Sequence, residues 1–169
     1  MTSPLVVVMG ISGVGKSAVG HAVADQVGVP YIDGDDLHPR ENIEKMSAGQ
    51  ALTDDDRWPW LERIGGWLAE HAEDGGVISC SALRRVYRDV LTKHAPSTVF
   101  LHLVGDHDLI RSRMEGRDHF MPVSLLESQE ATLEELESDE HGAVFDIVES
   151  PDRIATDFLQ WLWNQEDRS

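Results

Sequence analysis

One octapeptide near the N-terminus limits the possible folds more than any other part of the sequence. It is Gly10-Ile11-Ser12-Gly13-Val14-Gly15-Lys16-Ser17, and it has the spacing G-x-x-x-x-G-K-[ST]. The apolar run 5–9 before it predicts a buried parallel strand, and the residues after it predict a helix that ends at Gly28. Strand, glycine-rich turn and helix N-terminus form the context in which this motif binds nucleotide phosphates, because backbone N–H groups converge there on phosphate oxygens.

The motif also predicts the roles of two of its side chains. We expect Lys16 to neutralise the β- and γ-phosphates of a nucleotide, and the hydroxyl of Ser17 to bind Mg²⁺. The alternative is a turn that matches the pattern by chance, and the flanking strand and helix argue against it. Residues 10–17 are therefore the predicted phosphate-binding loop.

Composition excludes several classes of protein. At 169 residues, with 41% hydrophobic and 27% charged residues, the chain suits one globular domain with a sizeable core. A net charge of −17 argues against a nucleic-acid partner, because nucleic-acid binders display basic surfaces. The same charge repels anionic substrates, so a nucleotide site needs its own local cations.

Cysteine usage and hydropathy bear on the compartment. The single cysteine, Cys80, excludes an internal disulfide and is expected to be a buried core thiol in a reducing compartment. There is no basic segment of a signal peptide, and no apolar stretch approaches the roughly 18 residues of a membrane-spanning helix. We therefore expect a cytoplasmic protein with no membrane association.

A pair of carboxylates follows the second predicted strand, at 29–33. Asp33 and Asp35 can point the same way just past its C-terminal end, at the sheet edge where open parallel sheets bind ligands. One carboxylate could hold Mg²⁺ through water, and the other could accept a proton from an attacking hydroxyl. The alternative is an Asx-type turn that leads into a helix capped by Asp36.

Arginines supply the candidate cations. A helix capped by Thr53 begins with three aspartates at 54–56, and Arg57 is either a substrate clamp or their partner. In a helix predicted from residue 81 to about 93, Arg84 and Arg88 share a face, which is either part of the site or simply solvated. Arg117 lies in a segment between a glycine and a proline that breaks the helical pattern. This segment is either a lid over a phosphate or an ordinary surface loop.

The element pattern indicates the fold class. Apolar strands at 5–9, 29–33, 76–80, 98–103 and 143–148 alternate with helices, which predicts a three-layer α/β domain with a parallel sheet. His102 on the fourth strand is expected to be a hydrogen-bonded sheet histidine. Residues 124–137 predict an acidic, mostly solvated helix, and residues 106–137 together an inserted lid region within a single domain, 1–169.

With these motifs placed, the sequence resembles the small P-loop gluconokinases, which are related to shikimate kinase and the nucleoside monophosphate kinases. The resemblance covers nearly the whole chain. Its most discriminating parts are the block Asp-Gly-Asp-Asp-Leu-His-Pro at 33–39 and the block Asp-Asp-Asp-Arg at 54–57. Further matching stretches are 42–46, 52–53, 80–83, 87–89 and 119–120.

The resemblance implies an activity and a fold. It implies that the protein, commonly as a homodimer, uses ATP and Mg²⁺ to phosphorylate D-gluconate to 6-phospho-D-gluconate. It also implies strand order 2-3-1-4-5, with a helical lid at about 116–123. The alternatives are a P-loop kinase for another small hydroxy acid such as shikimate, and a nucleotide-hydrolysing switch module.

Similarity to the shikimate kinases implies roles for individual residues. Asp33 would lie near Mg²⁺, and Asp35 would bind the acceptor hydroxyl and take its proton. Arg113 would lie near the adenine, and Arg117 would contact the transferring phosphoryl group. The candidates for binding the substrate carboxylate are Arg57, Arg84, Arg88, His38 and Arg40.

Overall fold

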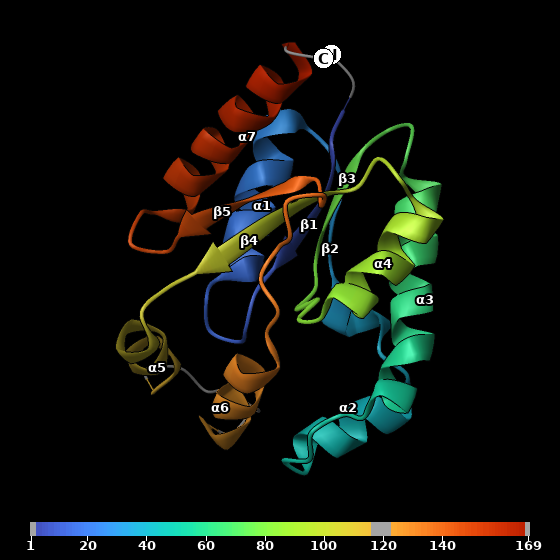
Figure 1. Cartoon of the computed structure of the whole chain (residues 1–169), viewed down its shortest axis with the longest axis vertical. Helices are drawn as coiled ribbons and strands as arrows, with labels where there is room; N and C mark the ends of the chain where they lie inside the picture. Colours follow the sequence, from blue (N-terminus) through green and yellow to red (C-terminus); the bar gives the residue numbers. More distant parts are fainter. Residues whose placement is uncertain (1–2, 116–122, 168–169) are drawn as a thin grey trace.

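The computed structural model describes residues 3–115 and 123–167 (Figure 1). Its strands are β1 (Leu5–Met9), β2 (Tyr31–Asp33), β3 (Gly76–Ser79), β4 (Val99–Val104) and β5 (Gly142–Asp146). Its helices are α1 (Lys16–Val27), the 3-10 helix η1 (Gly34–Leu37), α2 (Arg40–Ser47), α3 (Asp54–Glu70), α4 (Arg85–His94), α5 (His107–Glu115), α6 (Val123–Thr132) and α7 (Pro151–Asp167).

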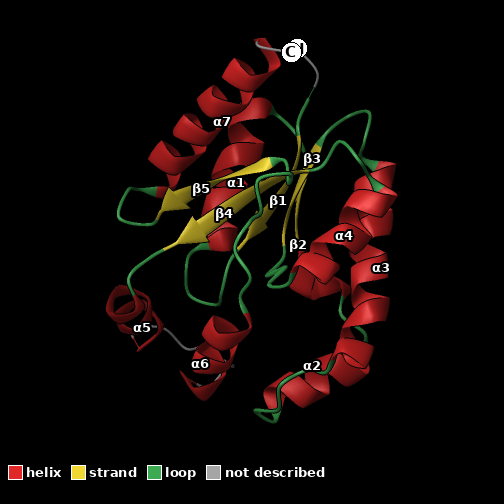
Figure 2. Cartoon of the chain, in the orientation of Figure 1, coloured by secondary structure: helices red, strands yellow, loops and turns green. Residues whose placement is uncertain are grey.

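The strands form one parallel sheet in the order β2-β3-β1-β4-β5, which confirms the expected α/β topology. Helices cover both faces of the sheet, with α1 and α7 on one side and α3 and α4 on the other (Figure 2). Parallel strands place their carboxyl ends at one edge, and α2, α5 and α6 lie beyond that edge, at the bottom of Figure 1. The phosphate-binding loop and the carboxylate pair emerge at this same edge.

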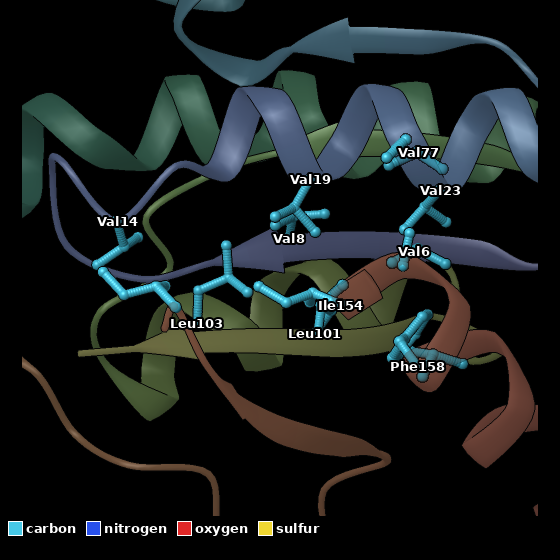
Figure 3. Packing of buried hydrophobic residues seen from close by; sticks show 14 of the residues in the cluster. Val6, Val8, Val14, Val19, Val23, Val77, Leu101, Leu103, Ile154 and Phe158 are labelled. Carbon is cyan, nitrogen blue, oxygen red and sulfur yellow. The ribbon is translucent and has the colours of Figure 1, made fainter. Parts of the chain in front are cut away.

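Alternation along β1 divides the core into two layers. Val6 and Val8 pack toward α1 and α7, where they meet Val23 and Phe158 (Figure 3). Leu5, Val7 and Met9, which alternate with them along β1, face α3 and α4. Each fully buried aliphatic side chain contributes about 1.5–3 kcal/mol, so this central strand must be apolar on both faces.

Helix α3 begins and continues for identifiable reasons. Thr53 is the expected N-cap residue, and it forms a capping box with Asp56, in which each side chain accepts the other residue's backbone N–H. The helix passes through the Gly65-Gly66 pair without a break. A Cβ at position 65 would collide with the ring of His94, so Gly65 allows α4 to pack closely against α3.

The strand ends differ from those predicted by at most two residues, and three helix boundaries differ for identifiable reasons. The helix expected from residue 81 begins at Arg85, because Ala82 has a left-handed backbone with φ 45°. The acidic helix ends at Thr132 and not at residue 137, and the chain then runs to β5 without regular structure. Asp36 caps no helix: Asp33 is the N-cap residue of η1 and accepts the backbone N–H of Asp35 at 2.9 Å.

His102 differs from its expected environment. Its side chain is 1% exposed on β4, and within the described part of the chain neither ring nitrogen has a hydrogen-bond partner. The prediction of a hydrogen-bonded sheet histidine was therefore wrong. Burial lowers the pKa of His102 to about 4, with Arg88 adding to the effect, so the ring is neutral in the core at pH 7.

The segment predicted as the lid lies mostly outside the described residues, which stop at 115 and resume at 123. None of the helices in the described ranges is both long enough and apolar enough to span a membrane.

Candidate active site

The phosphate-binding loop joins β1 to α1. Gly15, the residue before the first helical turn, has φ 92°, a conformation that glycine adopts without steric cost. Its carbonyl accepts the backbone N–H of Val19, so the helix starts inside the motif. The first N–H groups of α1 therefore point into the loop, where an anion can accept their hydrogen bonds.

The side chain of Lys16 folds back over this loop. Its Nζ donates to the carbonyl of Gly10 at 2.9 Å and to that of Ile11 at 3.0 Å. Burial lowers the pKa of Lys16, while the negative charges of Asp35 and Asp33 oppose that shift. The ammonium group is thus held at the loop, close to two carboxylates.

Asp35 lines the same pocket as Lys16. The Asp35 side chain is 60% exposed, yet partial desolvation of its carboxyl group raises the pKa of Asp35, and the neighbouring Asp33 raises it further. Lys16 opposes both effects. A carboxylate with a raised pKa accepts a proton more readily, as a general base requires.

The oxygen ligands at this edge suit Mg²⁺. Ser17, at the start of α1, and Asp33, at the end of β2, supply a hydroxyl and a carboxylate. Among the described residues, no group of three or more His, Cys, Asp or Glu side chains could hold a metal on its own. Mg²⁺ keeps several waters and commonly binds substrate phosphates beside one or two protein ligands, so these residues fit such an ion.

His38 forms part of the pocket wall. Its ring stacks on Trp60, with centroids 4.0 Å apart, and is almost fully buried. The amide of Asn42 donates to the carbonyl of Asp56 at 2.8 Å, so the nitrogen that lies 3.1 Å from Nδ1 of His38 is a donor. Burial lowers the pKa of His38 to about 4, with Arg57 adding to the effect. The neutral ring therefore carries its proton on Nε2, 3.7 Å from the carboxylate of Asp35.

The predicted arginines separate into different environments. Arg57 lines the pocket, donates to the hydroxyl of Tyr87 at 3.0 Å and lies 3.6 Å from Asp54. The predicted pairing with the aspartates is therefore present, and the role as a substrate clamp stays a prediction. Arg84 precedes the first turn of α4 and pairs with Asp54 at 2.9 Å, outside the pocket lining. Arg40 is 90% exposed and lies near Glu44.

Arg88 is a structural residue. Its guanidinium is fully buried and donates to Glu140 at 2.6 Å, to the carbonyl of Ala82 at 2.8 Å and to that of Glu135 at 3.2 Å. The expectation that Arg84 and Arg88 share a helix face at the site was wrong, because Arg84 lies outside the helix and Arg88 faces the core.

Two predicted arginines remain, Arg113 and Arg117. Arg113 on α5 is exposed and donates to the carbonyl of Ile147 at 3.2 Å. Arg117 lies outside the described residues.

The pocket has a wall that the sequence interpretation missed. Ser128, Gln129 and Thr132 of α6 line it together with the carboxylate pair, and Gln129 accepts the backbone N–H of Ser12 at 2.7 Å. The acidic composition of α6 predicted a solvated helix, and only its few uncharged polar residues could have indicated a binding face. Cys80 also lines the pocket, and burial raises its pKa to about 12, so its thiol stays protonated.

Comparisons with known proteins agree with this geometry. A family described as shikimate kinase matches residues 12–162. The thermosensitive gluconokinase of Escherichia coli K12 is 47% identical over 141 residues, which cover 82% of this chain and 75% of that protein. The gluconokinase of Gluconobacter oxydans is 46% identical over 157 residues, which cover 91% and 88%.

Solved structures give the same result. The crystal structure of a gluconokinase from Sinorhizobium meliloti 1021 superposes with a TM-score of 0.89 at 45% identity and covers 99% of this chain and 98% of that one. An APS kinase from Mycobacterium tuberculosis, at 17% identity and a TM-score of 0.70 over 95% and 98% of the two chains, shares the fold. The sequence motifs, the sheet order and these relatives together show that the chain belongs to the gluconokinase family of shikimate-kinase-like P-loop kinases.

Proposed function

We propose that this chain transfers the γ-phosphoryl group of ATP to D-gluconate and so forms ADP and 6-phospho-D-gluconate. One observation supports this most directly. Lys16 of the phosphate-binding loop, the carboxylate of Asp35 and the guanidinium of Arg57 line the same pocket. The relatives named gluconokinase, at 46–47% identity over most of the chain, supply the substrate class.

In the proposed mechanism, phosphoryl transfer depends on in-line positioning and on neutralising charge. The loop amides and Lys16 bind the triphosphate, and Ser17 and Asp33 hold Mg²⁺, which neutralises phosphate charge when bound. Asp35 orients the terminal hydroxyl of gluconate and accepts its proton. The hydroxyl oxygen bonds to the γ-phosphorus as the bond from that phosphorus to the leaving ADP oxygen breaks.

The gluconate carboxylate needs a cation at the other end of the pocket. Arg57 suits this role, because it lines the pocket and a guanidinium matches the geometry of a carboxylate. The neutral His38 can donate its Nε2–H to a substrate hydroxyl or to Asp35. Arg113 would approach the adenine from α5, and the role of Arg117 on the transferring group stays a prediction. Arg40, Arg84 and Arg88 lie outside the pocket lining and are not part of this proposal.

The proposal extends to the assembly and the compartment. We propose Mg²⁺ as the metal, a homodimer as the working form and the cytoplasm as the location, in line with the family resemblance and the single, buried thiol.

The test is ADP formation from ATP and Mg²⁺ with D-gluconate, with shikimate and with no acceptor. We expect a rate with gluconate at least 100-fold above the other two, together with 6-phosphogluconate in amounts equal to the ADP. A rate that gluconate does not change but shikimate raises would transfer the assignment to shikimate. A slow rate that neither acid changes would favour a hydrolysing switch.

A further inference from the structure

A hydrogen bond joins helix α6 to the phosphate-binding loop. Oε1 of Gln129 accepts the backbone N–H of Ser12 at 2.7 Å, across 117 positions of sequence. Gln129 is half-buried, and both residues line the pocket that also contains Lys16 and Asp35. The contact thus connects the nucleotide-binding loop to the wall of the acceptor pocket.

The C-terminal side of α6 is held in place by the strap, which we define as residues 133–141 between α6 and β5. The backbone N–H of Glu134 donates to the carbonyl of Leu83, and its carboxylate accepts the N–H of Arg85 at 2.8 Å. The guanidinium of Arg85 pairs with Glu137 at 2.6 Å and with Asp139 at 2.8 Å. Because the strap is attached to the loop at 81–84, which also lines the pocket, the C-terminal end of α6 is anchored beside the pocket.

The chemistry of the side chain at position 129 matters because of its surroundings. Glu127 and Glu130 flank it on α6, and the whole chain has a net charge of −17. A carboxylate could accept the N–H of Ser12 as well as a carboxamide does, but it would place a negative charge beside a loop built for a triphosphate. A neutral carboxamide oxygen accepts the N–H of Ser12 and adds no negative charge beside the loop.

We propose that Gln129 is a positioning residue, which ties the phosphate-binding loop to the acceptor wall and so directs the γ-phosphoryl group to the sugar acid and away from water. This rests on the proposed function. Without the tie, α6 and the loop separate and water enters between them. The bond from the γ-phosphorus to ADP then breaks as a bond to a water oxygen forms, which yields ADP, phosphate and a proton.

The experiment compares three variants of the full chain with wild type. Gln129→Ala removes the acceptor, Gln129→Glu keeps an acceptor but adds charge, and Glu127→Gln alters an exposed neighbour on α6 that lies outside the pocket lining. For each, the KM for ATP, the kcat with gluconate and the ADP formed without gluconate are measured, with thermal unfolding as a check on folding.

The proposal predicts a different defect for each variant. Gln129→Ala should raise the ratio of hydrolysis to transfer at least fivefold, with the KM for ATP within threefold of wild type. Gln129→Glu should raise the KM for ATP at least tenfold, and added salt should reduce that defect because it screens the new charge. Glu127→Gln should match wild type in all three quantities.

Other outcomes overturn the proposal. A folded Gln129→Ala enzyme with an unchanged ratio, whether or not kcat falls, shows only a structural role. If wild type transfers nothing to gluconate, the proposed function fails separately, and ATP affinity still decides the role of Gln129. Equal dissociation constants for ATP in the Ala and Glu variants would then contradict the proposal.

Discussion

At the residue scale, Lys16 and Asp35 influence each other through opposite charges, yet desolvation outweighs that attraction at both. The pKa of Asp35 is raised although a cation is near, and the pKa of Lys16 is lowered although two carboxylates are near. Each group is thus held closer to its neutral form than in water. For Asp35 this means a better proton acceptor, which is what the attack of an alcohol on phosphorus requires.

The role of Asp35 predicts a specific kinetic defect. Asp35→Asn should lower the kcat with gluconate by about 10²–10⁴-fold, the typical contribution of a general base, with little change in the KM for ATP. Asp36→Asn is the matched control, because Asp36 is exposed and outside the pocket lining. Steady-state kinetics of both variants test this, and wild-type kcat in Asp35→Asn would remove Asp35 from the mechanism.

The buried histidines predict how stability depends on pH. The pKa of His102 falls from 6.5 to about 4 on folding, so between these values the unfolded chain binds protons that the folded chain does not. The free energy of unfolding therefore decreases as the pH falls from about 6.5 toward 4, by about 2 kcal/mol for this group between pH 7 and 4.5. His38 changes in the same direction.

Substitution of His102 isolates its contribution to the pH dependence of the free energy of unfolding. Urea unfolding of His102→Leu at pH 7 and at 4.5 should show a pH effect smaller by that amount. His141→Gln, at an exposed histidine, should keep the full wild-type effect. If His102→Leu had the same pH dependence as wild type, the low pKa of His102 would be contradicted.

At the scale of elements, the strap explains where the helix prediction failed. The acidic composition of 124–137 indicates a solvated helix. Leu133 and Leu136, however, are partly buried against the two core layers, so the chain leaves the helix there and runs along the core. The glutamates that follow then meet arginines of α4. Such partners lie about 50 residues away in the chain, so no local pattern could identify them.

The buried ion pair between Arg88 of α4 and Glu140 of the strap predicts an effect on stability without an effect on catalysis. Arg88 and Glu140 are 1% and 4% exposed, so Arg88→Met removes the main partner of a buried carboxylate and leaves it with Arg85 at 3.8 Å and the N–H of Glu137. The substitution should cost about 3 kcal/mol, the lower end of the range for breaking a buried pair. The double variant Arg88→Met/Glu140→Leu should recover much of this loss, and Arg40→Met, at an exposed site, should cost little. Urea unfolding measures all three.

Enzyme kinetics separate this role from substrate binding. The folded fraction of Arg88→Met should keep the wild-type KM for gluconate. A KM raised tenfold or more in a variant of wild-type stability would return Arg88 to the substrate site.

At the scale of the whole molecule, most of the fold could be predicted because its signals are local. The apolar runs, the glycine-rich loop and the capping box at Thr53 each depend on a few neighbouring residues. The site could be predicted in part. Asp33, Asp35 and Arg57 follow strand ends or motifs and do line the pocket, whereas Gln129 reaches Ser12 only through the tertiary fold.

The predicted single domain has a thermodynamic test. The sheet is continuous and both core layers share β1, so the chain should unfold in one cooperative transition. Calorimetry should give equal calorimetric and van't Hoff enthalpies. Two resolved transitions would contradict the single-domain prediction.

The central claim is that Asp35 directs the terminal hydroxyl of gluconate at the γ-phosphorus of a nucleotide held by residues 10–17. A crystal structure with gluconate and a non-hydrolysable ATP analogue tests it most directly. The account predicts a hydrogen bond of about 2.6–3.0 Å between that hydroxyl and the Asp35 carboxylate, with Arg57 at the gluconate carboxylate. Gluconate bound in the opposite direction, or bound away from Asp35, would contradict it.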